Sequence, residues 1–170
     1  TAKFDMTLWN VNGLKNSSTD ARRKRKLQSV AKVCARTACS AYVETHWSDK
    51  DRRLHQQTIT QRSAAFTVGP SNKEGVGFAS HRSWLQVTSH HAVSTRLMMV
   101  RLLVHDTKLT GLVVYAPNGD NERCQFFSGP LTETLERYNP DFVMGDWNVV
   151  LNHQTDSIGH KLTHKASAAV

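Results

Sequence analysis

Residues suited to phosphoryl chemistry stand at the ends of four short apolar segments of the sequence. They are Asn10, Glu44, Tyr115, and the pair Asp146 and Asn148. Taken singly, each has an ordinary explanation, because Asn and Asp are common turn residues. Polar groups that follow several strands of an open α/β sheet, however, meet at one edge of that sheet. Their chemistry therefore has to be considered together.

These residue types match what is needed to hydrolyse a phosphodiester with a divalent metal ion. Glu44 would hold Mg²⁺, which takes one or two carboxylates and keeps several waters. Asp146 would activate the attacking water and Asn148 would orient it. Donors from Tyr115 and Asn118 would stabilise the charged phosphate oxygens.

The elements that must position these residues are predicted to alternate between strand and helix. Residues 4–11 alternate apolar and polar side chains, as in a half-buried strand, and residues 41–43 form another short strand. Helices are predicted over residues 17–40 and 121–138. Pro130 lies inside the second helical pattern and should kink or break it.

The middle of the chain is rich in predicted strands, and residues 89–91 are expected to be a polar connection. Turn residues and short polar links separate the strands and predict antiparallel pairing. The predicted strands are residues 64–68, 75–80, 84–88, 96–104, 108–115 and, before Asp146, 142–144. The pattern as a whole predicts an α/β fold.

The composition predicts a globular domain that acts on a polyanion. The 170 residues carry 22 Lys and Arg against 14 Asp and Glu, a net charge of +8. No apolar run approaches the roughly 18 residues that cross a bilayer, so no membrane partner is expected. Three cysteines suit neither a disulfide framework nor a metal clip, which favours an intracellular setting.

Residues 22–26 are five consecutive basic residues in the first predicted helix. A solvated outer face is the default interpretation of such a run. A DNA-facing patch and a nuclear-import signal are the alternatives.

Five motifs in order resemble the endonuclease/exonuclease/phosphatase superfamily, which includes DNase I and exonuclease III. They are LWNVNGLKN, YVETHWSD, EGVGFAS, VVYAPNGDNER and VMGDWNVVL. The Glu-Thr-His and Gly-Asp-x-Asn motifs look most like those of the endonuclease domains of LINE-type non-LTR retrotransposons. The resemblance implies a DNase I-like four-layer α+β sandwich over residues 1–170.

Carried over residue by residue, the resemblance implies a metal site and a phosphate site. Glu44 would be the metal ligand with Asn10 beside it, for Mg²⁺ or alternatively Mn²⁺. Asp146, Asn148 and Tyr115 would be catalytic. Phosphate or DNA contacts would come from Asn118 and Arg123.

The carboxyl end departs from the family pattern. Nothing after Asp156 matches the family's later Asp or its Ser-Asp-His motif. The chain is therefore expected to be a single domain truncated at its carboxyl end. It would contain largely the first half of the fold and only the first strand of the second sheet, with an unpaired edge on that strand.

The resemblance implies a Mg²⁺-dependent DNA endonuclease that nicks DNA within a nuclear retrotransposon polyprotein, upstream of a reverse transcriptase. The truncated chain alone is expected to be inactive. One alternative is a degenerate, non-catalytic remnant that at most binds nucleic acid. The other is a cellular phosphoesterase of the same superfamily that acts on a lipid or nucleotide.

Overall fold

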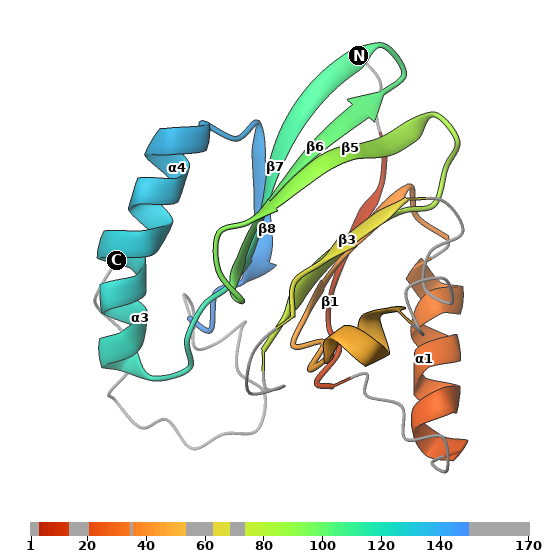
Figure 1. The fold of residues 1–170 in the computed structure, drawn as a ribbon, viewed down its shortest axis with the longest axis horizontal. Coiled ribbons are helices and arrows are strands. Elements are labelled where there is room, and N and C mark those ends of the chain that lie inside the picture. The colour runs from red at the N-terminus through yellow and green to blue at the C-terminus, as the bar shows by residue number, and fades with distance from the viewer. Residues whose placement is uncertain (1–3, 14–20, 35, 54–62, 69–73, 150–170) are drawn as a thin grey trace, which may run out of the picture.

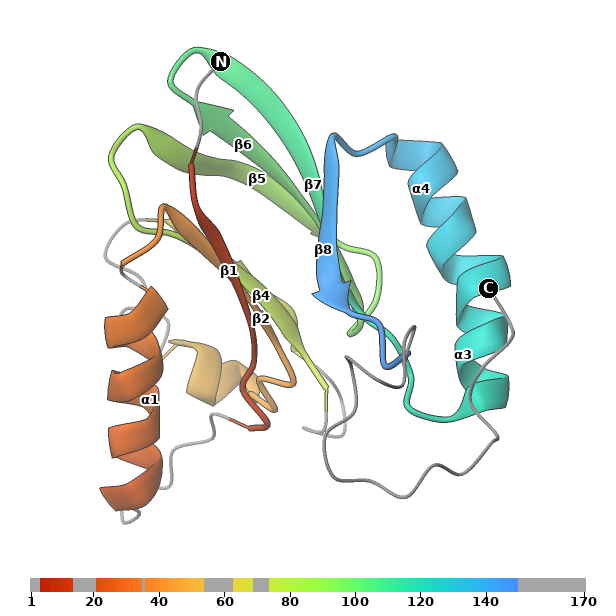
Figure 2. The same ribbon diagram turned by 180° about the vertical axis from the view of Figure 1, so that it is seen from behind.

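A computed structural model describes residues 4–13, 21–34, 36–53, 63–68 and 74–149 of the chain. Two four-stranded sheets face each other, and helices cover their outer faces (Figure 1). The layers run from helix α1 through the two sheets to the helical segment α3–α4, and the same order is visible from behind (Figure 2). The predicted α/β four-layer sandwich is confirmed.

The first sheet has the strand order β1-β2-β4-β3. β1 (Met6–Asn10) runs parallel to β2 (Cys39–Val43), whereas β4 (Val76–Ser80) is antiparallel to both β2 and β3 (Ala64–Phe66). β2 and β4 are buried along their whole length, because they are the central strands and both of their faces are covered.

The second sheet has the strand order β5-β6-β7-β8. β5 (Leu85–Ala92), β6 (Leu97–Val104) and β7 (Thr107–Tyr115) form an antiparallel meander, and β8 (Phe142–Asp146) pairs in parallel with β7. The expectation that only one strand of the second sheet would be present is wrong. The meander belongs to that sheet, because it hydrogen-bonds to β8 and not to β3 or β4. β8 is an edge strand in the described part of the sheet.

The second helical segment continues through Pro130 rather than breaking there. α3 (Asp120–Phe126) passes into a π-helical turn (Phe127–Leu131) and then into α4 (Thr132–Tyr138). Proline has no N–H to donate, and the wider π turn accommodates its ring. The Thr132 hydroxyl donates to the Phe127 carbonyl at 2.7 Å, which satisfies one displaced backbone acceptor. No helix in the described residues is long and apolar enough to cross a membrane.

The first helix is shorter than the sequence pattern predicts. α1 (Ala21–Cys34) ends before residue 35, and Cys39 and Ser40 already pair with Met6 and Thr7 in the sheet. Hydrogen bonds to β1 and β4 therefore override the helical pattern at the carboxyl end of this segment. Residues 17–20 of the predicted helix lie outside the described residues.

The predicted polar connection at residues 89–91 is instead part of β5. The strand continues past a bulge between Val87 and Ser89, and its remaining residues stay exposed. Polar side chains are compatible with this position because β5 is an edge strand and both faces of its second half are exposed.

The burial of β1 also differs from the prediction. Met6 and Leu8 are 40% and 39% exposed, although the apolar positions of a half-buried strand should face the core. Trp9, on the opposite face, packs in the cluster that contains Val30 of α1. β1 is the edge strand of its sheet, so its inner face extends past the cover of the second sheet.

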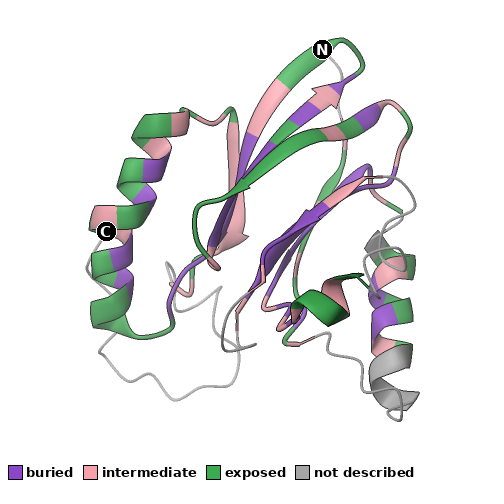
Figure 3. Cartoon of the chain, viewed as in Figure 1, coloured by how far each residue is buried: buried purple, intermediate pink, exposed green. Residues whose placement is uncertain are grey.

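Three apolar clusters hold the layers together. Buried residues lie along both sheets and on the sides of the helices that face them (Figure 3). The largest cluster lies between the sheets, and the other two attach α1 to the first sheet and α3–α4 to the second. Their fully buried members include Phe78 and Met98 between the sheets, Tyr42 and Trp47 beneath α1, and Leu112 beneath α3–α4.

Gly145 in β8 is tightly packed against β7. A Cβ atom there would lie 2.2 Å from the carbonyl oxygen of Val114 and 2.7 Å from its Cβ. Gly145→Ala should therefore lower the free energy of unfolding in urea by about 1–3 kcal/mol, as other overpacked core substitutions do. Gly129→Ala is the matched control, because nothing lies within 4 Å of a Cβ at that position. Equal unfolding midpoints for the two variants would contradict the close β7–β8 packing.

His81 makes the stability of the fold dependent on pH. Its Nε2 lies 2.9 Å from the Ser40 hydroxyl, and its Nδ1 has no hydrogen-bond partner among the described residues. Burial, and then the charge of Arg82, lower the pKa of His81 below its usual value. Since the unfolded chain then takes up the proton first, stability should fall as the pH drops through about 6.5. The slope of unfolding free energy between pH 7.5 and 5 should be smaller in His81→Gln, and identical slopes would contradict this assignment.

Candidate active site

The candidate site lies where the carboxyl ends of four strands meet. β1 ends at Asn10, Glu44 follows the last residue of β2, and β7 and β8 end side by side at Tyr115 and Asp146. Each parallel pair is joined by a helical crossover, which brings both of its carboxyl ends to the same edge. The two edges face each other across the sandwich (Figure 2).

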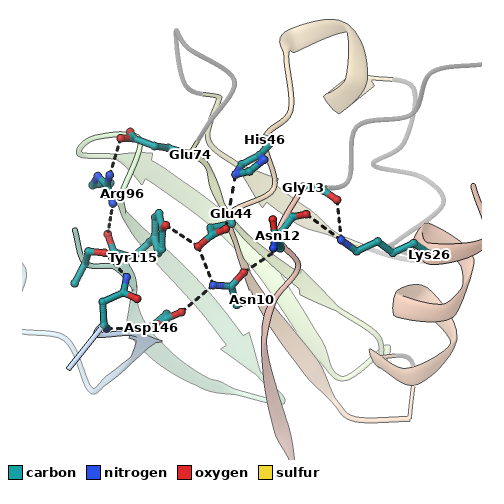
Figure 4. Close-up of polar contacts among 12 residues, drawn as sticks. Asn10, Asn12, Gly13, Lys26, Glu44, His46, Glu74, Arg96, Tyr115 and Asp146 are labelled. Atoms are coloured by element: carbon teal, nitrogen blue, oxygen red, sulfur yellow. Dashed lines mark hydrogen bonds and ion pairs between the residues drawn. The ribbon is translucent and has the colours of Figure 1, made fainter. Parts of the chain in front are cut away.

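The side chain of Asn10 bridges two carboxylates from different sheets (Figure 4). Its Nδ2 donates to Glu44 Oε1 and to Asp146 Oδ2, each at 2.9 Å. Its Oδ1 accepts from the backbone N–H of Asn12 at 3.0 Å, which fixes the orientation of the amide. Asn10 therefore uses both amide hydrogens to hold the carboxylates near each other.

Glu44 is fixed by side-chain donors from β1 and β7. Besides Asn10, the Tyr115 hydroxyl donates to Oε1 at 2.6 Å, and His46 Nε2 lies 3.8 Å from Oε2. Glu44 itself has a positive φ of 55°, in the left-handed region, and its carbonyl accepts from the N–H of Gly13 at 2.7 Å. Burial, then the hydrogen bond to Glu44 and its charge, raise the pKa of Tyr115 to about 12. The phenol is therefore a stable donor near neutral pH.

Asp146 and Asn148 form a rigid tip after β8. Asp146 Oδ1 accepts from the N–H of Asn148 at 3.1 Å, and Asn148 Nδ2 donates to the carbonyl of Ala116 at 2.7 Å. Asn148 also has a positive φ, of 49°. The tip borders a groove of about 470 Å³ between β1 and β8, lined by Leu8, Asn10, Gly145, Asp146, Trp147, Asn148 and Val149. Three of the predicted site residues, Asn10, Asp146 and Asn148, thus line one open groove, whereas Glu44 and Tyr115 are not among its lining residues.

Asn118 lies in the loop between β7 and α3, and Arg123 lies in α3 itself, so their side chains are arranged differently from the others. Asn118 is exposed. Arg123 is buried, and its guanidinium donates to the carbonyls of Asn118 at 2.9 Å and Pro117 at 3.4 Å, and to the Asp120 carboxylate at 2.5 Å. These contacts make Arg123 a brace of the loop that presents Asn118.

Four residues that were not predicted to belong to the site also contact it or its loops: Lys26, His46, Glu74 and Arg96. Lys26 Nζ donates to the carbonyls of Asn12 and Gly13 at 2.9 and 3.1 Å. Glu74 and Arg96 precede β4 and β6, whose amino ends lie at the edge where β2 and β7 end. The location of Glu74 and Arg96 at this edge therefore follows from the antiparallel pairing of the strands that they precede.

The donor set fits a hard divalent cation such as Mg²⁺. Glu44 and Asp146 supply carboxylate oxygens on either side of the Asn10 amide, and Asp146 lines the open groove. Mg²⁺ is usually held by one or two carboxylates plus water. The described residues contain no group of three or more His, Cys, Asp and Glu side chains that would form an all-protein cage. The residues that could hold the ion are therefore Glu44 and Asp146, with the Asn10 amide between them.

Several solved structures share this fold at low sequence identity. They include TDP2 from Caenorhabditis elegans, with a TM-score of 0.55, 16% identity and coverage of 84% of this chain and 46% of that one. The catalytic domain of Xenopus laevis APE2 gives a TM-score of 0.58 and 16% identity, with coverage of 86% and 59%. D. rerio TDP2 complexed with a single-strand DNA product gives 0.57 and 18%, with coverage of 84% and 60%.

Comparison with protein-family models and with curated proteins yields no match for the sequence. The chain spans 46%, 59% and 60% of the lengths of these three solved structures. What the likeness shows is the architecture: the chain shares the DNase I-like α/β sandwich fold of these solved structures.

Proposed function

We propose that this chain is part of a Mg²⁺-dependent phosphodiesterase that cleaves DNA. The observation that carries the proposal is the bridge from Asn10 to Glu44 and Asp146, with the Tyr115 hydroxyl on the same Glu44 oxygen. Two carboxylates that accept from the same amide nitrogen lie close enough to repel each other, and the donors around them offset that repulsion. A fold has little structural reason to gather such groups beside an open groove, whereas phosphoryl chemistry needs them there.

Mg²⁺, or alternatively Mn²⁺, would be held by Glu44 and Asp146, with Asn10 setting their spacing. When bound, the ion would offset negative charge on the scissile phosphate. The amide of Asn10 would also keep one oxygen of each carboxylate turned toward the same point.

The remaining proposed roles follow from the donors and acceptors around the groove. Asp146 would accept a proton from the attacking water, and Asn148 would keep that carboxylate oriented through its backbone N–H. Tyr115 would hold Glu44 in place and offer its hydroxyl dipole to the phosphate region. Asn118, which is exposed in the loop after β7, would donate to a phosphate oxygen, and Arg123 would keep its loop in position.

The finer proposal is an endonuclease, or nickase, domain of a LINE-type retrotransposon polyprotein. It is supported by the sequences of the motifs around Glu44 and Asp146 and by the net charge of +8. D. rerio TDP2, of similar fold, was solved with a single-strand DNA product. A reverse transcriptase would then follow in the same polyprotein, which would act in the nucleus.

Removing either carboxylate should abolish cleavage. In the full natural length of the protein, Glu44→Gln and Asp146→Asn should each reduce Mg²⁺-dependent nicking of supercoiled plasmid by about 100-fold or more. Glu44→Gln should also weaken binding of Mn²⁺, measured by electron paramagnetic resonance, about tenfold or more. DNA affinity should change little, because neither residue is a basic contact.

Glu133→Gln is the matched control, since Glu133 is an exposed carboxylate on α4. Undiminished nicking by the Glu44 and Asp146 variants would refute the site. DNA binding without cleavage in the full-length wild type would instead favour the non-catalytic remnant. Cleavage of a lipid or nucleotide phosphoester in preference to DNA would favour the cellular phosphoesterase.

The DNA is proposed to pass along the amino-terminal end of α1. A helix that connects two parallel strands starts at their carboxyl edge, so residues 22–26 of α1 lie at the same end of the fold as the site. Lys26 demonstrates this proximity, because it contacts the loop that follows Asn10 (Figure 4). α1 has no acidic residue in its first turn to offset the basic run.

Arg23→Gln combined with Lys24→Gln should weaken DNA binding more than the matched pair Lys32→Gln and Arg36→Gln at the other end of the segment. Each lost phosphate contact should reduce the slope of log affinity against log salt by about 0.7–0.9. Fluorescence anisotropy over a salt series measures both quantities. If the two double variants have equal slopes of log affinity against log salt, the DNA does not pass along the amino-terminal end of α1. That result would not bear on the proposed chemistry at Glu44.

A further inference from the structure

Arg96 lies on the ring of Tyr115. Its Cζ is 4.7 Å from the ring centroid, and its Nη1 lies 3.4 Å from the Tyr115 carbonyl oxygen. The sheet dictates this placement, because Leu97 pairs with Val114 and the Tyr115 N–H donates to the Arg96 carbonyl at 2.8 Å. Arg96, which precedes β6, therefore lies opposite Tyr115, the last residue of β7.

Glu74 fixes the other side of the guanidinium. Glu74 Oε1 lies 2.8 Å from Arg96 Nη2, and its second oxygen accepts from the Thr95 hydroxyl. Both side chains are about three-quarters buried, with exposures of 23% and 25%. The Glu74 carbonyl also accepts from the N–H of His46 at 2.9 Å, two residues after Glu44. Glu74 thus ties Arg96 to the segment that presents Glu44.

The contacts form one continuous chain into the candidate site (Figure 4). Arg96 covers the Tyr115 ring, and the Tyr115 hydroxyl donates to Glu44 Oε1 at 2.6 Å. The same oxygen accepts from Asn10, which also holds Asp146. A rotation of the Tyr115 ring away from Glu44 would remove one of the donors that keep the two carboxylates together.

We propose that the Glu74–Arg96 ion pair is a clamp that keeps the Tyr115 hydroxyl on Glu44. Arg96 and Glu74 are thus positioning residues for the proposed phosphodiesterase site, and this inference rests on that function. The planar guanidinium is suited to the task, because it stacks on the ring while pairing with a carboxylate.

A double-mutant cycle tests whether Arg96 acts through Tyr115. Arg96→Met keeps the aliphatic stem but removes the charge and the planar group, and it should weaken Mn²⁺ binding about three- to tenfold at an unchanged Tm. The same substitution in a Tyr115→Phe background should have less than about a twofold effect, since the hydroxyl that it positions is already gone. Glu74→Gln should behave like Arg96→Met, and Arg101→Met, an exposed arginine of β6, should have no effect.

An NMR measurement reports on the clamp without metal or catalysis. The chain has only three tyrosines, so the ring signals of Tyr115 can be assigned by substitution. In Arg96→Met and Glu74→Gln, those signals should shift and the ring should flip faster, while Arg101→Met leaves them unchanged. Unchanged Tyr115 signals, or an Arg96→Met effect on Mn²⁺ binding that is equally large with and without the Tyr115 hydroxyl, would overturn the clamp. If the Tyr115 ring signals change but every variant, including Glu44→Gln, binds Mn²⁺ as the wild type does, the proposed function is overturned and the clamp is not.

Discussion

One amide group connects the two sheets of this molecule at the end that carries the candidate site. Asn10 belongs to the first sheet, and its Nδ2 hydrogens reach a carboxylate beside the first sheet and another from the second. The contact requires that both parallel strand pairs end at the same edge and that the apolar layer between the sheets sets their separation. Ordinary packing between the sheets therefore determines the distance between Glu44 and Asp146.

The electrostatics of the site follow from this arrangement. Carboxylates close together disfavour joint ionisation unless donors or cations surround them. Here amide, phenol and backbone N–H donors contact the two groups, and His46 lies beside Glu44. The amide, phenol and backbone donors are uncharged, so they reduce the repulsion without supplying positive charge. A divalent cation would supply it, and in this respect the hydrogen bonding supports the proposed function.

Much of the site could be predicted from the sequence because Asn10, Glu44, Tyr115 and Asp146 each follow an apolar strand. The rule that chemistry gathers at carboxyl ends of strands was sufficient for them. Glu74 and Arg96 were missed because they precede strands, and their position becomes evident only once the antiparallel neighbours are known. The predicted strands of the β5–β7 meander were assigned to the first sheet for the same reason, whereas they belong to the second sheet with β8. Alternation specifies that a segment is a strand, but not which strand it pairs with.

The hairpin between β6 and β7 gives a distant loop control over the site. Pairing runs without a bulge from Val104 and Thr107 at the turn to Leu97 and Val114 at the functional end. In a sheet, a slip of one residue turns every side chain to the opposite face. The length of the exposed turn at residues 105–106 thus determines whether Arg96 meets Tyr115 at all. A single inserted residue there could disconnect the site without altering any side chain within it, so loop length at the far end of the sheet is itself a functional property.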